Sequence, residues 1–140
     1  AYGNGTVVIV GSEGNGCRST DGGQNWETSD LAEGIGSDLL FDGENFRIFG
    51  NSAVFTSVDG MTWSKSTIPI QSVGASAISD DGQIAAARGG WQNWYDRQEF
   101  YHAPDAATWD VITSPNVAGG HPIQHVVFGW GTPSSVCPAD

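Results

Sequence analysis

Residues 89–100 (GGWQNWYDRQEF) hold a dense group of aromatic and hydrogen-bonding side chains. Flat aromatic rings match the apolar faces of pyranose sugars, and the amide and carboxylate groups between them could bond to sugar hydroxyls. Loops on a rigid scaffold are where binding residues concentrate. We therefore predict a ligand-contact site made by Trp91, Trp94, Tyr95 and Arg97. Packing of the same rings on a neighbouring repeat or another subunit is the alternative that the sequence leaves open.

Acid–base chemistry has few candidates in this chain. Glycoside hydrolysis requires paired carboxylates. Asp80 and Asp81 are adjacent, but Gly82 follows them, and that order is ordinary for a turn. Glu99 lies beside aromatic residues, and its pattern favours a solvent-facing strand position. A complete catalytic pair would need groups from outside the chain.

Metal and phosphate sites are also not predicted. His121 and His125 are four residues apart, a spacing that binds metals on a helix, but Pro122 and the β-type run beyond it argue against a helix. The Gly-rich segment GSEGNG (11–16) lacks the Lys and the following helix that a phosphate loop needs. We predict no metal and no cofactor.

The composition limits the classes of partner. The chain has 140 residues, about one domain, and a formal net charge of −11. Such a surface repels phosphate backbones and anionic lipids, so we predict no nucleic-acid partner and no membrane partner. Carbohydrate and protein ligands remain compatible with it.

Cys17 and Cys137 are the two cysteines. One disulfide in an acidic, Lys-poor chain is typical of exported proteins. We predict a disulfide between them, with two free thiols as the alternative, and a secreted, extracellular or periplasmic location. The chain begins at Ala1 without Met or an apolar leader, which we interpret as a processed chain or a piece of a longer precursor.

The elements that would position these residues recur along the chain. The dipeptides Asn4-Gly5, Asp42-Gly43 and Asp81-Gly82 begin 38 and 39 residues apart, and each precedes a β-type run that ends in Gly. Such dipeptides are hairpin signals, because type I′ turns need positive φ at both central residues. The spacing predicts repeated β-hairpins, and no segment predicts an amphipathic helix.

Each repeat contains four short predicted strands. About forty residues and four antiparallel strands are the period of a β-propeller blade. We predict an all-β fold of about three to three and a half blades, with residues 1–140 as one domain. The expected units are 1–30, 37–68 and 75–114, with a partial strand at 124–132.

The two ends of the chain share a pattern. FGWGT (128–132) is similar to YGNGT (2–6), so we expect the first unit to lack its opening strand and the tail to carry a spare one. Propellers have about four to eight blades, so three units cannot close a ring. We predict completion by a missing remainder, another propeller chain or self-association, and two copies would supply six blades.

A second pattern recurs later in each repeat, as STDGGQNW (19–26), SVDGMTW (57–63) and PDAATW (104–109). Asp accepts hydrogen bonds from the backbone of its own turn, Gly supplies positive φ, and Ser adds a second local bond. Trp begins the next strand and covers the turn with its ring. Turn chemistry explains every position, so the pattern predicts a structural corner.

These corners resemble the Asp-box, or BNR repeat, S/T-x-D-x-G-x-x-W, of sialidases, xyloglucan-degrading glucanases, sortilin-type receptors and other propellers. The first copy matches in full, the second is one residue shorter, and the third keeps Asp and Trp. The resemblance implies a fold marker on the outer turn between the third and fourth strands, far from the ligand face. The implied box residues are Ser19, Asp21, Gly23, Trp26, Ser57, Asp59, Trp63, Asp105 and Trp109.

The resemblance also sets a standard for catalysis. Sialidases of this family use three arginines on the substrate carboxylate, a Tyr–Glu nucleophile pair and an Asp acid/base, and this chain has four arginines in all. FRIF (46–49) differs from the family's Phe-Arg-Ile-Pro and follows the first box, so we expect Arg47 to be a strand residue with a solvated head. We predict a non-catalytic recognition or scaffold module that contacts glycans through residues 91–97. Part of a sialidase-type glycoside hydrolase and a structural assembly subunit are the alternatives.

Overall fold

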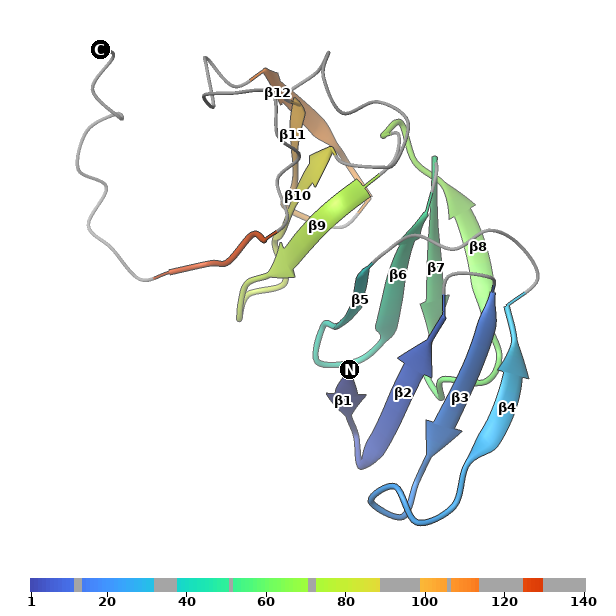
Figure 1. Ribbon diagram of the computed structural model, residues 1–140. Helices are drawn as coiled ribbons and strands as arrows, with labels where there is room; N and C mark the ends of the chain where they lie inside the picture. The colour runs from blue at the N-terminus through green and yellow to red at the C-terminus, as the bar shows by residue number, and fades with distance from the viewer. Residues whose placement is uncertain are drawn as a thin grey trace.

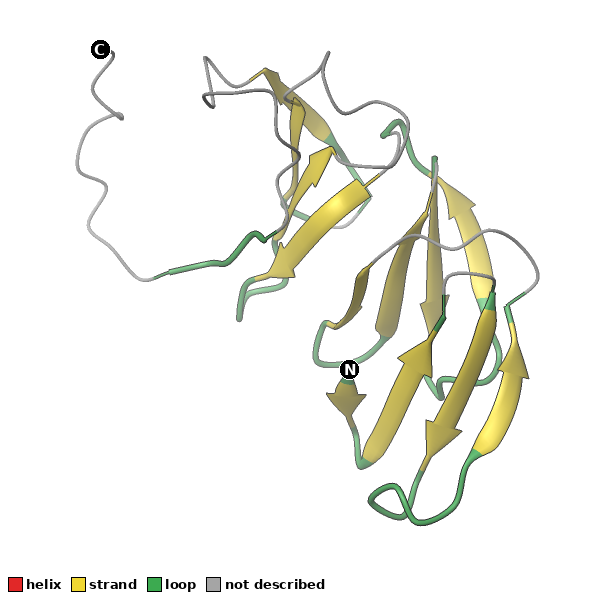
Figure 2. Cartoon of the chain, in the orientation of Figure 1, coloured by secondary structure: helices red, strands yellow, loops and turns green. Residues whose placement is uncertain are grey.

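A computed structural model describes residues 1–11, 14–31, 38–50, 52–70, 73–88, 99–105, 107–113 and 125–129 (Figure 1). The described residues form twelve strands and no helix (Figure 2), so none of them belongs to a helix of membrane-spanning length and apolarity. The strands are β1 (Tyr2–Gly3), β2 (Thr6–Val10), β3 (Asn15–Ser19), β4 (Glu27–Asp30), β5 (Asp38–Phe41), β6 (Phe46–Gly50), β7 (Ala53–Ser57), β8 (Ser64–Thr67), β9 (Val73–Ile78), β10 (Ile84–Arg88), β11 (Glu99–Ala103) and β12 (Asp110–Thr113).

The strands form three four-stranded antiparallel sheets in chain order, β1–β4, β5–β8 and β9–β12. Each strand pairs with the next along the chain, so each sheet is a simple meander (Figure 1). The first strands β5 and β9 adjoin, and Gly3 of β1 lies against the ring of Phe41 in β5. This is the blade arrangement that the repeats predict, and the all-β prediction is confirmed. We call the sheets blades 1, 2 and 3; the ring that they begin is open.

The opening strand of blade 1 differs from the prediction. Tyr2 and Gly3 form the short β1, which pairs with Val7 and Thr6 of β2. Ala1 extends the pairing, because its ammonium group donates to the carbonyl of Val8 at 3.0 Å and its carbonyl accepts from the Val8 N–H at 2.9 Å. The expectation that this unit lacks an opening strand is therefore wrong, since three residues suffice to pair with β2.

The turns between first and second strands follow the hairpin prediction with one correction. At Asn4 and Gly5 φ is +49° and +76°, as a type I′ turn requires. In the other two hairpins only Gly43 and Gly82 have positive φ, so these turns are not type I′. The Asp42 carboxylate instead accepts from the N–H groups of Glu44 and Asn45 at 2.9 and 2.6 Å, which holds the chain reversal by side-chain bonding.

The core lies in two layers between the blades, one on each face of blade 2. Ile48 and Phe55 join Leu31 and Trp63 in the layer between blades 1 and 2. Phe49 faces the other way, into the layer between blades 2 and 3. Because both faces of β6 are covered, buried apolar residues stand at consecutive positions such as Ile48 and Phe49 instead of alternating with polar ones.

The junction of blades 1 and 2 makes a specific demand on Gly60. Its φ is +74°, and a Cβ at this position would lie 2.5 Å from Cγ2 of Val8 in β2. Gly43 has a similar φ of +99° but nothing within 4 Å of an added Cβ. A side chain at Gly43 would therefore cause backbone strain alone, whereas one at Gly60 would cause both backbone strain and a clash with blade 1.

We expect Gly60→Ala to lower the free energy of unfolding by about 2–4 kcal/mol, from positive-φ strain plus overpacking against Val8. Gly43→Ala, the matched control, should lose about 1 kcal/mol from strain alone. Urea unfolding followed by tryptophan fluorescence measures both. Equal losses would show that the packing of Gly60 on blade 1 contributes nothing.

Candidate functional site

The predicted ligand-contact residues Trp91, Trp94, Tyr95 and Arg97 lie outside the described residues, between β10 and β11. In a meander, the connection from second to third strand lies at the opposite end of the sheet from the other two connections. The segment that carries these residues therefore leaves blade 3 at the end opposite the Asp105 corner. That placement stays a prediction for the side chains themselves.

The two strand ends that bear this segment are joined by an ion pair. Nη1 of Arg88, the last residue of β10, lies 3.0 Å from Oε2 of Glu99, the first residue of β11. The Tyr101 hydroxyl donates to the same oxygen at 2.8 Å. The Arg88 side chain is only 7% exposed, so the pair has little access to water. Glu99 faces these partners rather than solvent, which corrects the expectation above.

This carboxylate, arginine and phenol are not disposed for catalysis. Tyr101 is 2% exposed and belongs to the core between blades 2 and 3, so its hydroxyl is closed to a substrate. A nucleophile must be within reach of the reacting carbon. The group of three instead fixes the separation of the strands from which residues 89–98 depart.

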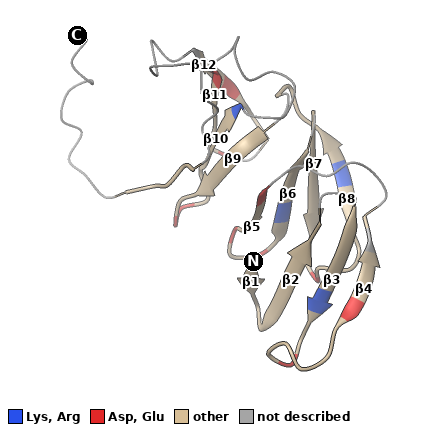
Figure 3. Cartoon of the chain, viewed as in Figure 1, with Lys and Arg blue, Asp and Glu red and all other residues tan. Residues whose placement is uncertain are grey.

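The other described arginines are also held by carboxylates. Arg18 bonds through Nε to Oε2 of Glu27 at 2.9 Å, and Arg47 bonds to the Asp42 carboxylate. The Arg47 side chain is 19% exposed, so its head is not solvated as expected but is tied to the β5–β6 turn. Basic residues lie on separate strands of the three blades (Figure 3). The described arginines thus form no shared site for a substrate carboxylate.

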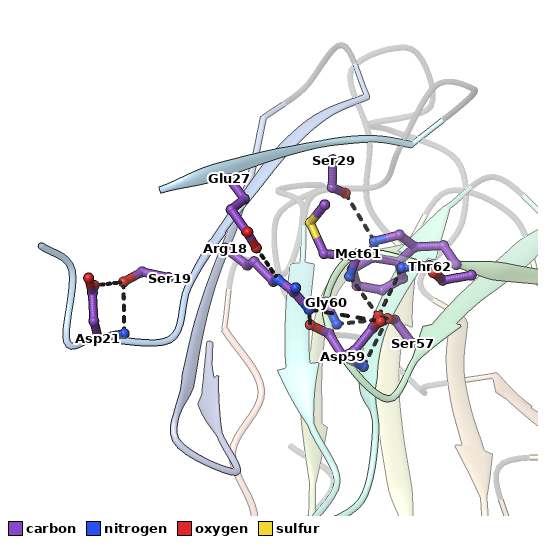
Figure 4. Close-up of polar contacts among 11 residues, drawn as sticks. Arg18, Ser19, Asp21, Glu27, Ser29, Ser57, Asp59, Gly60, Met61 and Thr62 are labelled. Atoms are coloured by element: carbon purple, nitrogen blue, oxygen red, sulfur yellow. Dashed lines mark hydrogen bonds and ion pairs between the residues drawn. The ribbon is translucent and has the colours of Figure 1, made fainter. Parts of the chain in front are cut away.

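The corner of blade 1 is built around the Asp21 carboxylate. Oδ1 accepts from the backbone N–H groups of Gln24 and Asn25, both at 2.9 Å, and from the Ser19 hydroxyl at 2.8 Å. Ser19 is 1% exposed and also accepts from the Gly23 N–H at 2.8 Å. One carboxylate and one hydroxyl therefore accept the backbone N–H groups of Gly23, Gln24 and Asn25. Figure 4 shows the bond between Ser19 and Asp21.

Blade 2 repeats this corner with one residue fewer. Oδ1 of Asp59 accepts from the N–H groups of Met61 and Thr62 at 2.8 and 2.9 Å, and the Ser57 hydroxyl accepts from Gly60 at 2.8 Å. Blade 3 keeps only the carboxylate part: Asp105 accepts from Ala107 and Thr108, at 3.0 and 2.6 Å. The position of Ser57 is taken there by the buried Ala103.

Two of the corner tryptophans pack on the preceding blade, which the sequence pattern did not predict. Trp63 lies against the core between blades 1 and 2, and its Nε1 donates to the Ser29 hydroxyl of blade 1 at 3.3 Å. Trp109 meets Phe49 of blade 2 edge to face, with ring centroids 5.9 Å apart. Trp26 covers its own turn, as expected, and donates from Nε1 to the Gly23 carbonyl at 3.0 Å.

Arg18 adds a polar link between blades. Its Nη1 donates to the backbone carbonyl of Asp59 at 2.9 Å and lies 3.8 Å from the Asp59 carboxylate (Figure 4). The corner of blade 2 is therefore bonded to the third strand of blade 1. Because both partners are partly exposed, this link contributes little to stability and mainly aligns blade 2 with blade 1.

A groove of about 690 Å³ runs beside β9 at the same end as the Asp corners. Its wall contains Ile78 of β9 and Leu40 of β5, and the opposite side is formed by residues 126–129, which lie outside the three sheets. Asp80 and Asp81 are among its polar lining residues. The sequence predicted a partial strand at 124–132, but the described residues 125–129 belong to no strand, so the groove was not predicted. The adjacent carboxylates at Asp80–Asp81 were the available signal.

The described residues bear only in part on the predictions about metals and the disulfide. No three His, Cys, Asp or Glu side chains come together there as a metal site. Cys17 lies in β3 and forms no disulfide within the described part of the chain. Cys137 lies outside the described residues, so the predicted disulfide stays a prediction.

Four-stranded meanders that pack face to face, with their first strands adjoining, define the blades of a β-propeller. No protein-family model and no curated protein matches this chain. Among solved structures, one described as "YCF48 bound to D1 peptide" is similar, with a TM-score of 0.49 and 16% sequence identity over 74% of this chain. The chain spans 34% of the length of that neighbour.

The corner bonds also act on acidity. Hydrogen bonds from Asn25 and then from Ser19 lower the pKa of the Asp21 carboxyl from 3.8 to about 2. The pKa of the Asp59 carboxyl is also lowered, mainly by the hydrogen bond from the backbone N–H of Thr62. The pKa of the Asp105 carboxyl is lowered in the same way, mainly by the backbone N–H of Thr108. Each corner therefore favours the ionised carboxylate.

We expect the Asp21 carboxyl to titrate near pH 2 in a carbon-detected NMR experiment, against 3.8 for an ordinary Asp. Because the folded pKa is the lower one, the stabilisation is complete above pH 4 and is lost as pH falls from about 4 towards 2. Thermal midpoints should drop across that window, and less so in Asp21→Asn. A titration midpoint near 3.8 would show that the corner does not bind the anion.

Proposed function

We propose that this chain is a non-catalytic recognition and scaffold module of the Asp-box propeller type. The observation that carries the proposal is how the described charged groups are used. Arg18, Arg47 and Arg88 are each bonded to a carboxylate, and the corner aspartates bond backbone N–H groups. Charges engaged in holding strands and turns are poor candidates for binding a substrate carboxylate or moving a proton.

The assignment to the Asp-box type rests on residue roles at the corners. Ser19 and Ser57 bond the turn Gly, Asp21 and Asp59 bond the following N–H groups, and the Trp directly precedes the next strand rather than beginning it. These are the roles that the motif implies for each position. An exported location follows from the acidic composition and the two cysteines, and belongs to the same proposal.

We place the ligand site at residues 89–98, on the end of blade 3 away from the corners. Arg88 and Glu99, which flank this segment, are joined by an ion pair with Nη1 and Oε2 3.0 Å apart, so a binding loop would start from a rigid base. Trp91, Trp94 and Tyr95 would stack on sugar rings, and Arg97 would bond to hydroxyl or carboxylate groups. A neutral or acidic glycan is the ligand class that these side chains suit.

The test is retention on a glycan array and by immobilised oligosaccharides. Trp91→Ala with Trp94→Ala should weaken binding about tenfold for each lost ring, since one ring contact is worth about 1.4 kcal/mol. The matched control, Phe at both positions, keeps a flat ring and should keep most of the affinity. Circular dichroism verifies the fold of both variants.

Two results would contradict the glycan proposal. Unchanged retention by the double alanine variant would place the ligand elsewhere. Release of free sugar from a fluorogenic sialoside by the wild-type chain would favour the sialidase-type hydrolase instead, with catalytic groups beyond those described here.

The groove beside β9 favours a protein ligand as a second candidate. It is lined by apolar Leu40, Ile78 and Phe128 and by acidic Asp80 and Asp81. An extended apolar segment with a Lys or Arg at one end fits that distribution of charge.

A labelled apolar peptide ending in Lys should therefore bind, and Phe128→Asp should abolish its fluorescence anisotropy signal. Val58→Asp provides a control, because Val58 is 70% exposed and lies outside the groove. Equal binding by both variants would exclude the groove as the peptide site.

The ring of this module also requires further blades. Three blades leave the ring open, and propellers close with about four to eight. We propose that a remainder of a longer precursor, another propeller chain or a second copy supplies the other blades. The faces left without a neighbour are the place to seek the contact.

A further inference from the structure

The face of blade 1 that points away from blade 2 has no neighbour within the described part of the chain. We call it the open face: Tyr2, Val7, Ile9, Cys17 and Trp26. Tyr2, Ile9 and Trp26 are 68%, 50% and 42% exposed. Large apolar side chains gathered on one sheet face mark a contact surface.

The strand register aligns the open face of blade 1 with the face of blade 2 that packs on blade 1. In blade 1, Ile9 pairs with Cys17, and in blade 2 the same positions are Ile48 and Phe55. Val7 corresponds in the same way to Phe46. Phe46, Ile48 and Phe55 are 0%, 0% and 7% exposed, and the layer that holds Ile48 and Phe55 includes residues of blade 1. The open face thus has the pattern of a face that receives a preceding blade.

The contact between blades 1 and 2 shows how a preceding blade is received. Val8 meets Gly60, Arg18 bonds to the Asp59 carbonyl at 2.9 Å, and Ser29 accepts from Trp63 at 3.3 Å. All three residues of blade 1 lie on the face turned to the next blade, which we call the following face. At the Asp21 corner the matching space is empty, because a Cβ on Gly22 would meet nothing within 4 Å.

Blade 3 carries a following face without a described blade beyond it. His102 pairs with Asp110 as Arg18 pairs with Glu27, so His102 occupies the position of Arg18. Ile112 pairs with Phe100 as Ser29 pairs with Gly16, and Ile112 is 51% exposed. On this face, Ala75, Ala77 and Ala87 of β9 and β10 are already buried within the chain. The residues of β11 and β12 remain for a partner: Phe100, His102 and Ile112.

We infer that the open face of blade 1 docks on the following face of blade 3 of a second copy. By the equivalence above, the ring of Trp26 would lie on Ile112 of the second copy. His102 of that copy, whose Nε2 lies 2.9 Å from Oε1 of Gln83, would face the Asp21 corner. Two such contacts, one at each end, join two copies into a closed ring of six blades. The inference rests on the propeller module proposed above and adds which surfaces meet.

The charge of the chain sets the conditions for this contact. Each copy has a formal net charge of −11, so the two copies repel one another over long range. The contact surfaces are mainly apolar, and added salt screens the repulsion without weakening apolar burial. Association should therefore strengthen as the salt concentration rises.

Sedimentation velocity of the whole 140-residue chain tests the inference. The wild type should be a dimer at about 100 µM in moderate salt, and Ile9→Lys should weaken association about 100-fold or more by burying a charge in the contact. Val58→Lys is the matched control: it changes a 70% exposed valine outside both surfaces and should leave the dimer intact.

A second pair of measurements identifies the partner surface. Ile112→Lys should break the dimer as Ile9→Lys does, and mixing the two monomeric variants should restore dimers through the one contact that remains intact. In a Cys137→Ser background, alkylation of Cys17 should slow at least about tenfold as the dimer forms, because a buried thiol is protected from reagent. Circular dichroism checks that each variant is folded.

Several results would overturn the inference. These are a monomer at about 100 µM in any salt, a dimer that Ile9→Lys leaves intact, or a dimer that Ile112→Lys leaves intact while Ile9→Lys breaks it. The last result would indicate that two open faces meet each other. Glycan retention by a monomeric variant shows separately that the recognition proposal stands when the ring proposal fails.

Discussion

The structure depends on side-chain oxygens that replace missing backbone partners at the corners of each blade. A reversal between the third and fourth strands leaves several N–H groups without a ladder partner. Asp21 and Asp59 accept these N–H groups, and buried serines accept the N–H of the turn glycine in blades 1 and 2. Because the turn is satisfied internally, the tryptophan that follows is free to pack. In blades 2 and 3 its ring contacts the preceding blade, so a local bonding pattern also fixes how blades stack.

Packing between blades explains why β6 of the middle blade is buried on both faces. Ile48 and Phe49 are adjacent in β6 and point in opposite directions, one towards blade 1 and one towards blade 3. Each blade is too thin to bury a core by itself, so its stability depends on its neighbours, as in other repeat proteins. The exposed Ile9 and Trp26 follow from the same geometry, because blade 1 has a neighbour on one face only.

In a repeat fold, a segment that the repeats do not require is a candidate for function. The described arginines and the corner aspartates hold the repeat together, which separates the scaffold from any ligand site. The departure from the repeat lies between Arg88 and Glu99, whose ion pair closes the base of the added segment. The proposed recognition by this segment and the proposed completion of the ring therefore involve different ends and faces of the blades.

The sequence by itself determined the repeat, the strand content and the positions of the corners. These features are local: an Asn-Gly or Asp-Gly hairpin and an Asp four or five residues before a Trp depend on nearby residues alone. Tertiary structure decided the rest. It placed Trp63 on Ser29 and Arg18 on the carbonyl of Asp59, and it turned Glu99 and Arg47 to partners rather than to solvent. It also formed the groove between β9 and residues 126–129. Such contacts join residues distant in the chain, and periodicity shows which face is apolar but not which element will cover it.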